Sequence, residues 1–396
     1  MGTEAAAPAP QLQTEQMSTW HPSTDEAGRL TIDMGAIAAN YRRLRAMHPA
    51  ARIGAVVKAD AYGLGAAQIA PMLAGQGARD FFVAHLAEAL ALKPLLPPDA
   101  AVFVLNGLAP GAERRCAEAG IIPVLSTPEQ ARDWHTFAAD AARTYPVALQ
   151  VDTGMSRLGL SEAELDDVLA WPGFSSRMNI RLLMTHMACA DTPGAPANAD
   201  QIRRFDRFSA RLPSVPRSLA NSAAAMFLPQ SGGDVLRPGL VLYGVDPGTA
   251  GIPGMLPAIR LNARVIQVRD IPAGAGVGYG FDYIADRPLR IATVSAGYAD
   301  GWPRALSRKG AVWFAGHRLP ILGRVSMDSC VVDVTNLSEA RICPGDSVEL
   351  IGRHQTVSDL AALLSTTPHE ILTSLGRRFA RSYINPPSLN GEEAQS

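Results

Sequence analysis

The chain has 396 residues, of which 47% are hydrophobic and 18% are charged, and its formal net charge is −1. This composition is typical of a folded globular protein with room for two domains, and it excludes a mainly disordered chain. The nearly neutral charge excludes a strongly basic surface that would attract nucleic acid or an anionic membrane.

Residues 1–28 are rich in Ala, Pro, Gln and Thr and lack the basic segment and apolar core of a secretory signal, so we expect a disordered tail. No apolar run reaches the roughly 18–20 residues that a membrane span requires. The cysteines are scattered without C-x-x-C spacing, which argues against a zinc site and indicates reduced thiols in the cytoplasm. They are Cys116, Cys189, Cys330 and Cys343.

After the tail, short apolar runs alternate with helical patterns. Asp33 is placed to cap a first helix, and further helical patterns cover residues 127–142, 162–169 and 199–212. The strand candidates are residues 53–57, 81–84, 102–105, 121–125, 147–151, 180–184, 218–220 and 234–236. Eight strands at this spacing predict an α/β fold with a (β/α)8 TIM barrel over residues 29–256. A doubly wound sheet is the alternative, because the last two strands are short.

After Pro257 the pattern changes to alternating strands separated by Pro and Gly turns, which predicts a mainly β domain over residues 257–388. The runs cover residues 264–268, 289–294, 312–314, 319–322, 331–334 and 348–351. Two helical patterns follow, over residues 357–364 and 369–375.

Lys58 stands at the end of the first barrel strand, and small or turn-forming residues follow it. A lysine at the mouth of a buried strand is partly desolvated, which lowers its pKa and makes the amine a usable nucleophile and base. The alternative is an ordinary loop lysine, because most lysines are exposed.

Further polar residues follow the later strands, and in a barrel they would meet Lys58 at the carboxyl ends of the strands. They are Arg157, His186, Asn221, Ser222, Arg237, Gly239 and Leu240. Barrels usually bind phosphate on the loops after the last two strands, where Ser222, Gly239 and Leu240 can donate hydrogen bonds. Taken alone, such sequences also fit plain turns.

Several of these side chains suit one kind of site. Arg237 would stay charged beside a pyridine nitrogen and leave that nitrogen unprotonated. His186 can connect Arg237 to a tyrosine, because imidazole donates from one nitrogen and accepts at the other. Arg157 can clamp a substrate carboxylate or hold the phenolate oxygen of a cofactor. Tyr279 lies between glycines at an expected loop tip and can serve as a general base beside such cations. Ordinary packing or surface roles are the alternative for each residue.

Eight motifs occur together, in the order AVVKADAYGLG, VDTGMSRLG, LMTHMA, ANSAA, LRPGLVLYG, VGYG, SAGYADG and GRVSMD. The chain therefore resembles the alanine racemase family over roughly residues 29–383. The resemblance implies pyridoxal 5'-phosphate as the cofactor, no metal, and an amino acid as the substrate. It also implies a barrel with a C-terminal β domain, and a head-to-tail homodimer in which each active site takes residues from the partner's β domain.

By this resemblance, Lys58 carries the cofactor and is one catalytic base, and Tyr279 of the partner subunit is the opposite base. The other site residues fall into three groups, which bind the phosphate, the pyridine ring and the substrate. The phosphate group is Tyr62, Ser222, Gly239 and Leu240, with Asn221 beside them. The ring group is Arg237 and His186, and the substrate group is Arg157, Met327 and Asp328.

Two positions depart from the family pattern. Gln150 stands where many members have a lysine, often carbamylated, so the chain lacks a negative charge beside Arg157. Arg377 aligns with a position that often holds a phosphate-binding tyrosine.

We expect racemisation of alanine in the cytoplasm, which supplies D-alanine for peptidoglycan.

Both departures can shift specificity, so a racemase of serine or of several amino acids is the alternative. A cofactor-binding protein without turnover is disfavoured by Tyr279. A decarboxylase is disfavoured by Arg237, because decarboxylases on this barrel usually pair the ring nitrogen with an acid.

Overall fold

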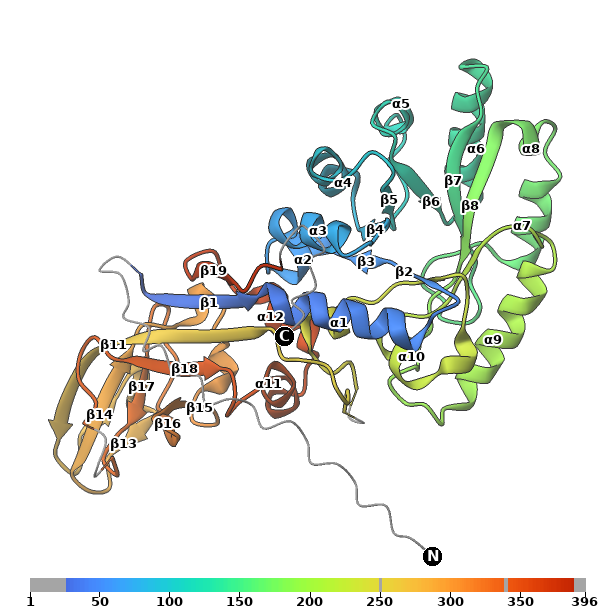
Figure 1. Cartoon of the computed structure of the whole chain (residues 1–396). Coiled ribbons are helices and arrows are strands. Elements are labelled where there is room, and N and C mark those ends of the chain that lie inside the picture. The colour runs from blue at the N-terminus through green and yellow to red at the C-terminus, as the bar shows by residue number, and fades with distance from the viewer. Residues whose placement is uncertain (1–25, 249–250, 338–340, 388–396) are drawn as a thin grey trace, which may run out of the picture.

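The computed structural model describes residues 26–248, 251–337 and 341–387, and it shows two domains built on separate sheets (Figure 1). Residues 1–25 of the predicted tail lie outside the described residues. The last residue of that tail, Gly28, instead begins strand β1 (Gly28–Asp33). No helix within the described ranges is both long and apolar enough to cross a membrane.

The barrel prediction is confirmed. A parallel ladder runs through seven strands in chain order: β3 (Ala55–Val56), β4 (Asp80–Val83), β5 (Ala101–Val104), β6 (Ile122–Leu125), β7 (Tyr145–Gln150), β8 (Met178–Met184) and β9 (Arg217–Ser218). The last strand, β10 (Val235–Leu236), pairs with β2 (Arg52–Ile53), which leads directly into β3. The amide of Arg237 donates to the carbonyl of Ala220 at 2.9 Å and so joins β10 to β9 as well. These bonds close the circle, so the doubly wound alternative is wrong.

Helices cover the outside of this ladder, as expected for a barrel in which strands and helices alternate (Figure 1). The helical segments of this domain are α1 (Met34–Met47), α2 (Lys58–Tyr62), α3 (Ala66–Gly75), α4 (Leu86–Leu92), α5 (Glu113–Glu118), α6 (Pro128–Asp140), α7 (Glu162–Leu169), α8 (Phe174–Arg177), α9 (Pro196–Ser209) and α10 (Ser222–Phe227), of which α2 is a short turn at the end of β3. The predicted cap of α1 is confirmed, because the Asp33 carboxylate accepts from the amide of Ala36 at 2.9 Å.

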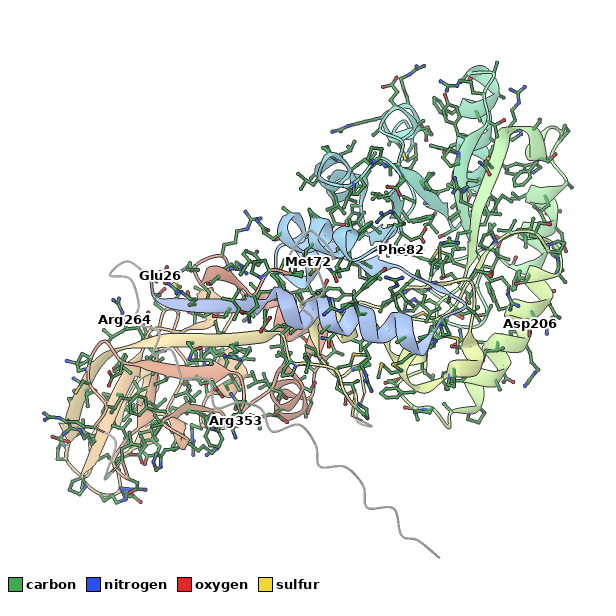
Figure 2. All side chains as sticks on the ribbon, in the orientation of Figure 1. Glu26, Met72, Phe82, Asp206, Arg264 and Arg353 are labelled. Carbon is green, nitrogen blue, oxygen red and sulfur yellow. The ribbon has the colours of Figure 1, made fainter. Side chains whose placement is uncertain are left out.

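The barrel strands are apolar on both faces because helices cover one face and the barrel interior takes the other. Phe81 and Phe82 on β4 are both fully buried, and Phe82 stacks on Phe103 with ring centroids 4.8 Å apart. Figure 2 shows the side chains of both domains, with Phe82 labelled in the barrel domain and Arg264 in the second domain. Polar side chains therefore gather at the strand ends rather than within the barrel wall.

The second domain is an eight-stranded sheet in the order β14-β17-β16-β15-β18-β11-β1-β19. An additional pairing between β14 and β11 makes part of this sheet close on itself. The strands after β1 are β11 (Ile259–Ile271), β14 (Leu289–Val294), β15 (Ala311–Phe314), β16 (His317–Leu322), β17 (Cys330–Asp333), β18 (Ser347–Ile351) and β19 (Ala380–Ile384). The final helices are α11 (Val357–Leu364) and α12 (Pro368–Ser374).

Strand β1 connects the two domains. Although it precedes the barrel in sequence, β1 pairs with β11 in antiparallel fashion and with β19 in parallel fashion, so it lies in the second sheet. The chain then enters the barrel through α1 (Figure 1). A small separate hairpin is formed by β12 (Gly276–Val277) and β13 (Tyr283–Ile284). This hairpin and β19 were not predicted from the sequence.

Candidate active site

Lys58 is the first residue of α2, at the carboxyl end of the first barrel strand. The four residues after it, Ala59 to Tyr62, have φ values of 52°, 55°, 53° and 59°, so this turn is left-handed. Such a conformation costs roughly 1–2 kcal/mol for each residue that is not glycine. Strain of this kind persists only where the surrounding structure imposes it, and it is concentrated at functional sites.

Bonds from distant elements hold the strained turn. The Glu88 carboxylate on α4 accepts from the amide of Ala59 at 2.6 Å. On the other side, the Arg381 guanidinium donates to the carbonyl of Gly63 at 3.1 Å, and the Tyr383 hydroxyl donates to that of Leu64 at 2.9 Å. Both Arg381 and Tyr383 belong to β19, so the second domain helps to fix the turn that carries Lys58.

The amine of Lys58 has a lowered pKa. Desolvation by burial is the largest cause, and the positive charges of Arg157 and Arg237 act in the same direction, whereas Glu88 opposes them. A lowered pKa increases the fraction of neutral amine, which is the form that attacks a carbonyl or removes a proton. The prediction of a desolvated lysine at the strand end is thus supported by its surroundings.

Arg237 is a buried cation, and only 3% of its surface is exposed. One terminal nitrogen donates to the carbonyl of Thr185 at 2.6 Å, and the other donates to the hydroxyl of Ser218. Burial lowers the pKa of Arg237 to about 10, so the guanidinium stays charged near neutral pH. Within the described ranges it forms no ion pair with a carboxylate. A buried cation with only neutral partners is prepared to bind an electron-rich group.

His186 follows Thr185 at the end of β8. Burial lowers the pKa of His186 to about 3, and the charges of Arg237, Arg157 and Lys58 contribute in the same direction. The imidazole is therefore neutral near pH 7 and keeps one donor and one acceptor nitrogen. No ring hydrogen bond from His186 to Arg237 is present in the described part of the chain, so the expected bridge to a tyrosine stays a prediction.

Ser222, Gly239 and Tyr62 form a close cradle at the loops after β9 and β10. The Ser222 hydroxyl accepts from the amide of Gly239 at 2.8 Å. A Cβ atom on Gly239 would lie 2.2 Å from the Tyr62 hydroxyl oxygen, so only glycine permits this approach. Leu240 begins the short 3-10 helix η3 (Leu240–Tyr243) directly afterwards. Backbone amides and hydroxyls at such a site suit a phosphate group.

Asn221 has a structural position beside this cradle. Its side-chain oxygen accepts from the amide of Ala224 at 3.0 Å and so caps α10, while its side-chain nitrogen donates to the carbonyl of Met187 at 3.2 Å. Asn221 thus joins the loop after β9 to the loop after β8 and fixes the first turn of the helix that begins with Ser222.

Arg157 lies on the exposed loop after β7, and the Asp152 carboxylate orders this loop by accepting from three successive backbone amides. Gln150 is 6% exposed, and its side-chain nitrogen donates to the carbonyl of Leu158 at 3.1 Å. Gln150 therefore tethers the loop on which Arg157 stands, but it supplies no negative charge. Arg157 also borders a surface cavity of about 430 Å³ together with Ser126.

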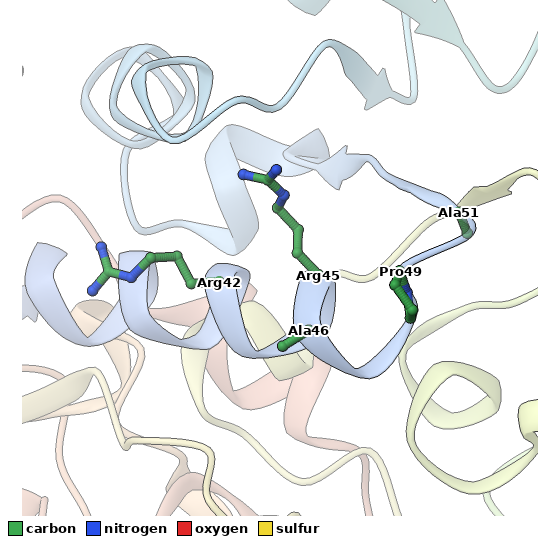
Figure 3. A pocket seen from close by; sticks show the side chains of 5 residues that line it. All are labelled: Arg42, Arg45, Ala46, Pro49 and Ala51. Carbon is green, nitrogen blue, oxygen red and sulfur yellow. The ribbon is translucent and has the colours of Figure 1, made fainter. Parts of the chain in front are cut away.

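A second surface cavity, of about 400 Å³, lies at the end of α1 (Figure 3). Its lining includes Arg42 and Arg45, and both arginines bond to Gln76 on the neighbouring segment. The other residues of its lining are small or apolar, so this cavity offers neither a nucleophile nor a general base. The chemistry of the chain is concentrated around Lys58.

The second domain holds the remaining predicted residues. Tyr279 begins the 3-10 turn η4 (Tyr279–Phe281) between β12 and β13, and 71% of its surface is exposed. Met327 is 52% exposed, and the Asp328 carboxylate accepts from Arg378 at 2.7 Å. The strand β13 lies at the end of the molecule far from the barrel (Figure 1). Within the described ranges, no hydrogen bond or ion pair joins these three residues to Lys58 or its neighbours.

Two family models match the chain, "Alanine racemase, N-terminal domain" over residues 32–247 and "Alanine racemase, C-terminal domain" over residues 258–383. The chain belongs to the alanine racemase family. The family resemblance and the enzyme class predicted from the sequence are therefore confirmed, since alanine racemases are isomerases.

Relatives in this family match nearly the whole chain. The alanine racemase of Brucella canis is 49% identical over 370 residues, which cover 90% of this chain and 93% of the relative. The protein of Agrobacterium fabrum named "Alanine racemase, catabolic" is 46% identical over 371 residues, which cover 94% and 96%.

Solved structures of alanine racemases show the same architecture. That of Bartonella henselae, described with covalently bound pyridoxal phosphate, has a TM-score of 0.87 and 44% identity, and the match covers 90% of this chain and 99% of that one. The enzyme of Streptomyces coelicolor has a TM-score of 0.85 and 34% identity, with coverage of 91% and 98%.

Sequence reasoning missed several residues of this alanine racemase site. Glu88 follows His85 at the spacing of a capping box after β4, which was a usable signal. His369 on α12 lies 5.5 Å from the Tyr62 ring, and burial lowers its pKa with a further contribution from Lys58. No local pattern marks His369 or Arg381, because each reaches the barrel site only through the packing of the two domains. Arg377 is exposed, and its role as a phosphate ligand stays a prediction.

Proposed function

We propose that this chain is a pyridoxal-phosphate-dependent alanine racemase that interconverts L-alanine and D-alanine. The observation that carries the proposal is Lys58, an amine with a lowered pKa on a strained turn, close to the buried unpaired cation Arg237. A lysine in this state suits covalent attachment of an aldehyde cofactor and later proton transfer.

The chain's own residues fit this cofactor. Its phosphate would be held by backbone amides and hydroxyls that converge at one place, where a Cβ atom on residue 239 would collide with the Tyr62 hydroxyl. These groups belong to Ser222, Gly239, Leu240 and Tyr62. Arg237 would face the ring nitrogen, and Lys58 would bind the aldehyde carbon. When bound, pyridoxal phosphate makes the Cα–H bond of an amino acid acidic by spreading negative charge into its ring.

Racemisation requires one base on each face of the substrate's Cα atom. In our proposal, the Lys58 amine removes or returns the proton on one face, and the hydroxyl of Tyr279 of the partner subunit does so on the other. Arg157 would bind the substrate carboxylate, because its guanidinium is exposed beside Lys58 and has no ion pair within the described ranges. Met327 of the partner subunit and Asp328 of the partner subunit would border the entrance.

The positions of these residues support a shared site. Tyr279 is exposed and lies on a hairpin far from the barrel of its own chain. The hairpin also exposes Phe281 and Ile284, at 67% and 53%. Apolar side chains exposed together in this way are typical of a surface that another molecule covers. We therefore propose a homodimer in which the hairpin of one subunit closes the barrel site of the other.

Arg237 favours racemisation over other reactions of the same cofactor. A charged arginine cannot give the ring nitrogen a proton at neutral pH, so that nitrogen stays largely unprotonated. The negative charge that develops at Cα is then less stabilised and is quenched quickly by a proton. Rapid return of the proton suits an enzyme that only exchanges the two faces of Cα.

The metabolic role is proposed separately from the chemistry. We propose that the enzyme works in the cytoplasm and supplies D-alanine for peptidoglycan. Two relatives, at 46% and 47% identity, are named catabolic alanine racemases. The second candidate role is therefore the use of alanine as a nutrient. Deletion of the gene separates the two roles. A requirement for added D-alanine supports cell-wall supply, whereas poor growth only on alanine as carbon source supports catabolism.

The chain contains three lysines, Lys58, Lys93 and Lys309, which makes the attachment site easy to test. The purified protein should show the absorbance of lysine-bound pyridoxal phosphate, and borohydride reduction followed by peptide mapping should place the label on Lys58. A Lys93→Arg/Lys309→Arg double variant serves as the matched control and should keep both the absorbance and the label. Label on Lys93 or Lys309, or no bound cofactor, would refute the proposal.

Substrate choice is tested on the same preparation. Alanine should be racemised with a higher kcat/KM than serine. Faster turnover of serine would instead support the alternative of a serine racemase. The sequence signal for that alternative is Gln150, which replaces a charged residue. Bound cofactor without turnover of either amino acid would support a cofactor-binding protein.

A further inference from the structure

Buried hydrogen bonds, joined through the residue Thr185, link Gln201 on α9 to Arg237. Gln201 is 3% exposed, and its side-chain nitrogen donates to the hydroxyl of Thr153 at 3.1 Å and to the carbonyl of His186 at 2.9 Å. Its side-chain oxygen accepts from the amide of Ala188 at 2.9 Å. The single amide of Gln201 therefore binds both the loop after β7 and the loop after β8.

The hydrogen bonds continue through two threonines. The hydroxyl oxygens of Thr153 and Thr185 lie 2.8 Å apart, and each residue is 1% exposed. The carbonyl of Thr185 in turn accepts from the Arg237 guanidinium at 2.6 Å. The Thr185–His186 segment is thus held twice, through the Thr185 hydroxyl and through the His186 carbonyl, and it presents the acceptor that orients Arg237.

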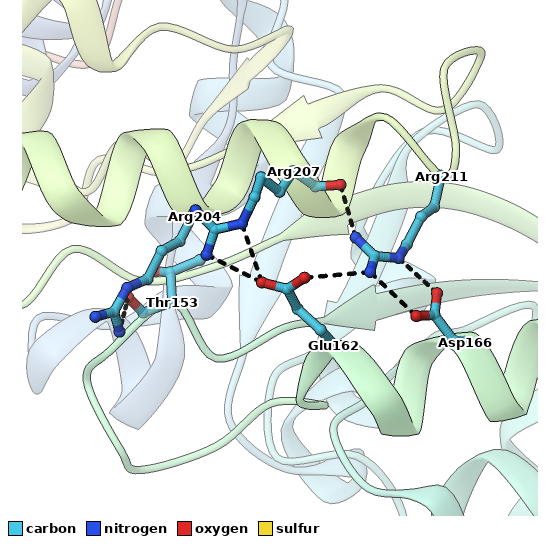
Figure 4. Close-up of polar contacts among 6 residues, drawn as sticks. All are labelled: Thr153, Glu162, Asp166, Arg204, Arg207 and Arg211. Atoms are coloured by element: carbon cyan, nitrogen blue, oxygen red, sulfur yellow. Dashed lines mark hydrogen bonds and ion pairs between the residues drawn. The ribbon is translucent and has the colours of Figure 1, made fainter.

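The outer face of α9 fixes the helix that supplies Gln201. Arg207 and Arg211 pair with Glu162 on α7 at 3.0 and 3.2 Å, and Arg204 donates to the carbonyl of Thr153 at 3.4 Å (Figure 4). Exposed ion pairs contribute little stability one by one, so these contacts mainly set the position of α9 relative to the loop after β7. Thr153 is then bonded through its backbone by Arg204 and through its side chain by Gln201.

Several neighbouring polar side chains buried behind one cation need an explanation, because aliphatic residues would fill this space without any desolvation penalty. A fully bonded polar network instead fixes one arrangement of the groups that it joins. We propose that Gln201 and Thr153 are positioning residues that hold the Thr185–His186 segment, and through it the guanidinium of Arg237, in line with the cofactor ring. This inference rests on the proposed function, because Arg237 matters there as the partner of the ring nitrogen.

Loss of this alignment should change the fate of the substrate and not only its rate. A displaced Arg237 lets water protonate the ring nitrogen, and the negative charge at Cα then persists longer. The side reaction that follows is transamination. In it, the amino group of alanine would replace the Lys58 amine on the cofactor's aldehyde carbon, and the proton removed from Cα would be delivered to that carbon. Water would then cleave the bond between Cα and nitrogen and supply the keto oxygen. Pyruvate would leave oxidised by two electrons, the cofactor would keep those electrons and the amino group, and the Lys58 amine would be left free. The ratio of pyruvate formed to racemisation events therefore reports the position of Arg237.

Two pairs of variants test the proposal on the holoenzyme. Thr153→Val removes the hydroxyl at nearly constant shape, and Thr153→Ser keeps it. Gln201→Glu removes both N–H donors and keeps the acceptor for Ala188. Ser209→Ala is the control on the same helix, because among the described residues its hydroxyl bonds only to the carbonyl of Phe205. Thermal unfolding and cofactor absorbance are measured first, so that a loss of folding or of cofactor is recognised.

We expect the ratio of pyruvate formed to racemisation events to rise about tenfold in Thr153→Val and Gln201→Glu. A tenfold rise corresponds to a change of about 1.4 kcal/mol in the difference between the two reaction barriers. Thr153→Ser and Ser209→Ala should keep the wild-type ratio. The 15N chemical shift of ring-labelled cofactor should move toward the protonated form in the first two variants only. An unchanged ratio and shift in folded Thr153→Val would overturn the positioning role, even if Gln201→Glu fails to fold. A wild-type protein that binds no cofactor at Lys58 would refute the proposed function instead.

Discussion

The site residues that we propose in the barrel and in the second domain are in opposite states. In the barrel, Arg237 is 3% exposed and bonded through two nitrogens, and Lys58 stands on a turn that two other segments, α4 and β19, hold. In the second domain, Tyr279 is 71% exposed on a small separate hairpin. One half of the site is thus organised within a single chain, while the other half is open surface.

This difference has a physical reason. Lowering the pKa of an amine requires burial, and a strained turn requires many fixed contacts, so both belong in the rigid barrel wall. A second base must reach the opposite face of a substrate that has already entered. A residue that comes from another subunit can do this without blocking the entrance in its own chain. The comparison predicts that the two halves fail in different ways when they are changed.

The largest expected effect comes from Tyr279→Phe. The change removes one hydroxyl from an exposed side chain, so the fold and the bound cofactor should be unaffected. Loss of one general base should lower kcat/KM by about 10²- to 10⁴-fold, and equally in both directions, because the equilibrium between enantiomers cannot change. Racemisation followed by circular dichroism measures the effect. Tyr283→Phe on the same hairpin is the control and should keep normal activity.

Mixing inactive subunits tests whether the site is shared. In our proposal, Lys58→Ala and Tyr279→Phe homodimers should each have little or no activity. In a mixed dimer, one of the two sites combines an intact Lys58 with an intact Tyr279. Random reassortment of equal amounts should therefore restore about a quarter of the wild-type activity. No recovery after confirmed subunit exchange would show that each site is built from one chain, and the hairpin proposal would be wrong.

Most of the barrel half could be predicted from the sequence, because its signals are local. The run ending at Lys58, and the polar residues after later strands, are patterns within a few positions, and parallel strands bring such ends together. The left-handed turn after Lys58 was not predicted, since Ala59 and Ala61 disfavour it and Asp60 alone, which tolerates it better, does not mark a whole turn. Glu88, Arg381 and Tyr383 impose that turn from distant positions in the chain.

The second domain was predicted less completely for the same reason. Strands with clear alternation, such as β14 and β18, were found within a residue of their ends. Strand β19 was missed because its residues are all half-buried and show no alternation, and because it is a sheet edge paired only with β1. His369 and the Gln201 network are set by contacts between elements, which no pattern in one stretch of sequence reveals.

Gly239→Ala should weaken cofactor binding by an intermediate amount. The added methyl group would lie 2.2 Å from the Tyr62 hydroxyl, so either Tyr62 or the loop must move away from the phosphate position. Overpacking of this kind costs roughly 1–3 kcal/mol, which corresponds to about a 5- to 150-fold change in the cofactor's dissociation constant. Gly194→Ala is the control, because no atom lies within 4 Å of its added methyl group. Equal affinities for the two variants would remove Gly239 from the cradle.

The smallest expected effect is the pH dependence that His186 gives the cofactor-free protein. Its pKa is about 3 in the folded chain, against an ordinary value of 6.5 when the chain is unfolded. Between these values the unfolded state binds a proton that the folded state does not, so stability falls as the pH falls below 6.5. Between pH 7 and pH 5.5 the loss from this group should be about 1 kcal/mol.

The measurement compares chemical unfolding of the wild type with that of His186→Gln at both pH values, so that other titrating groups cancel. The wild type should lose more stability than the variant by this amount. Identical pH slopes would mean that His186 is not held neutral by the barrel. That result would move the histidine from the preorganised half of the site to the half that, in our proposal, the partner subunit completes.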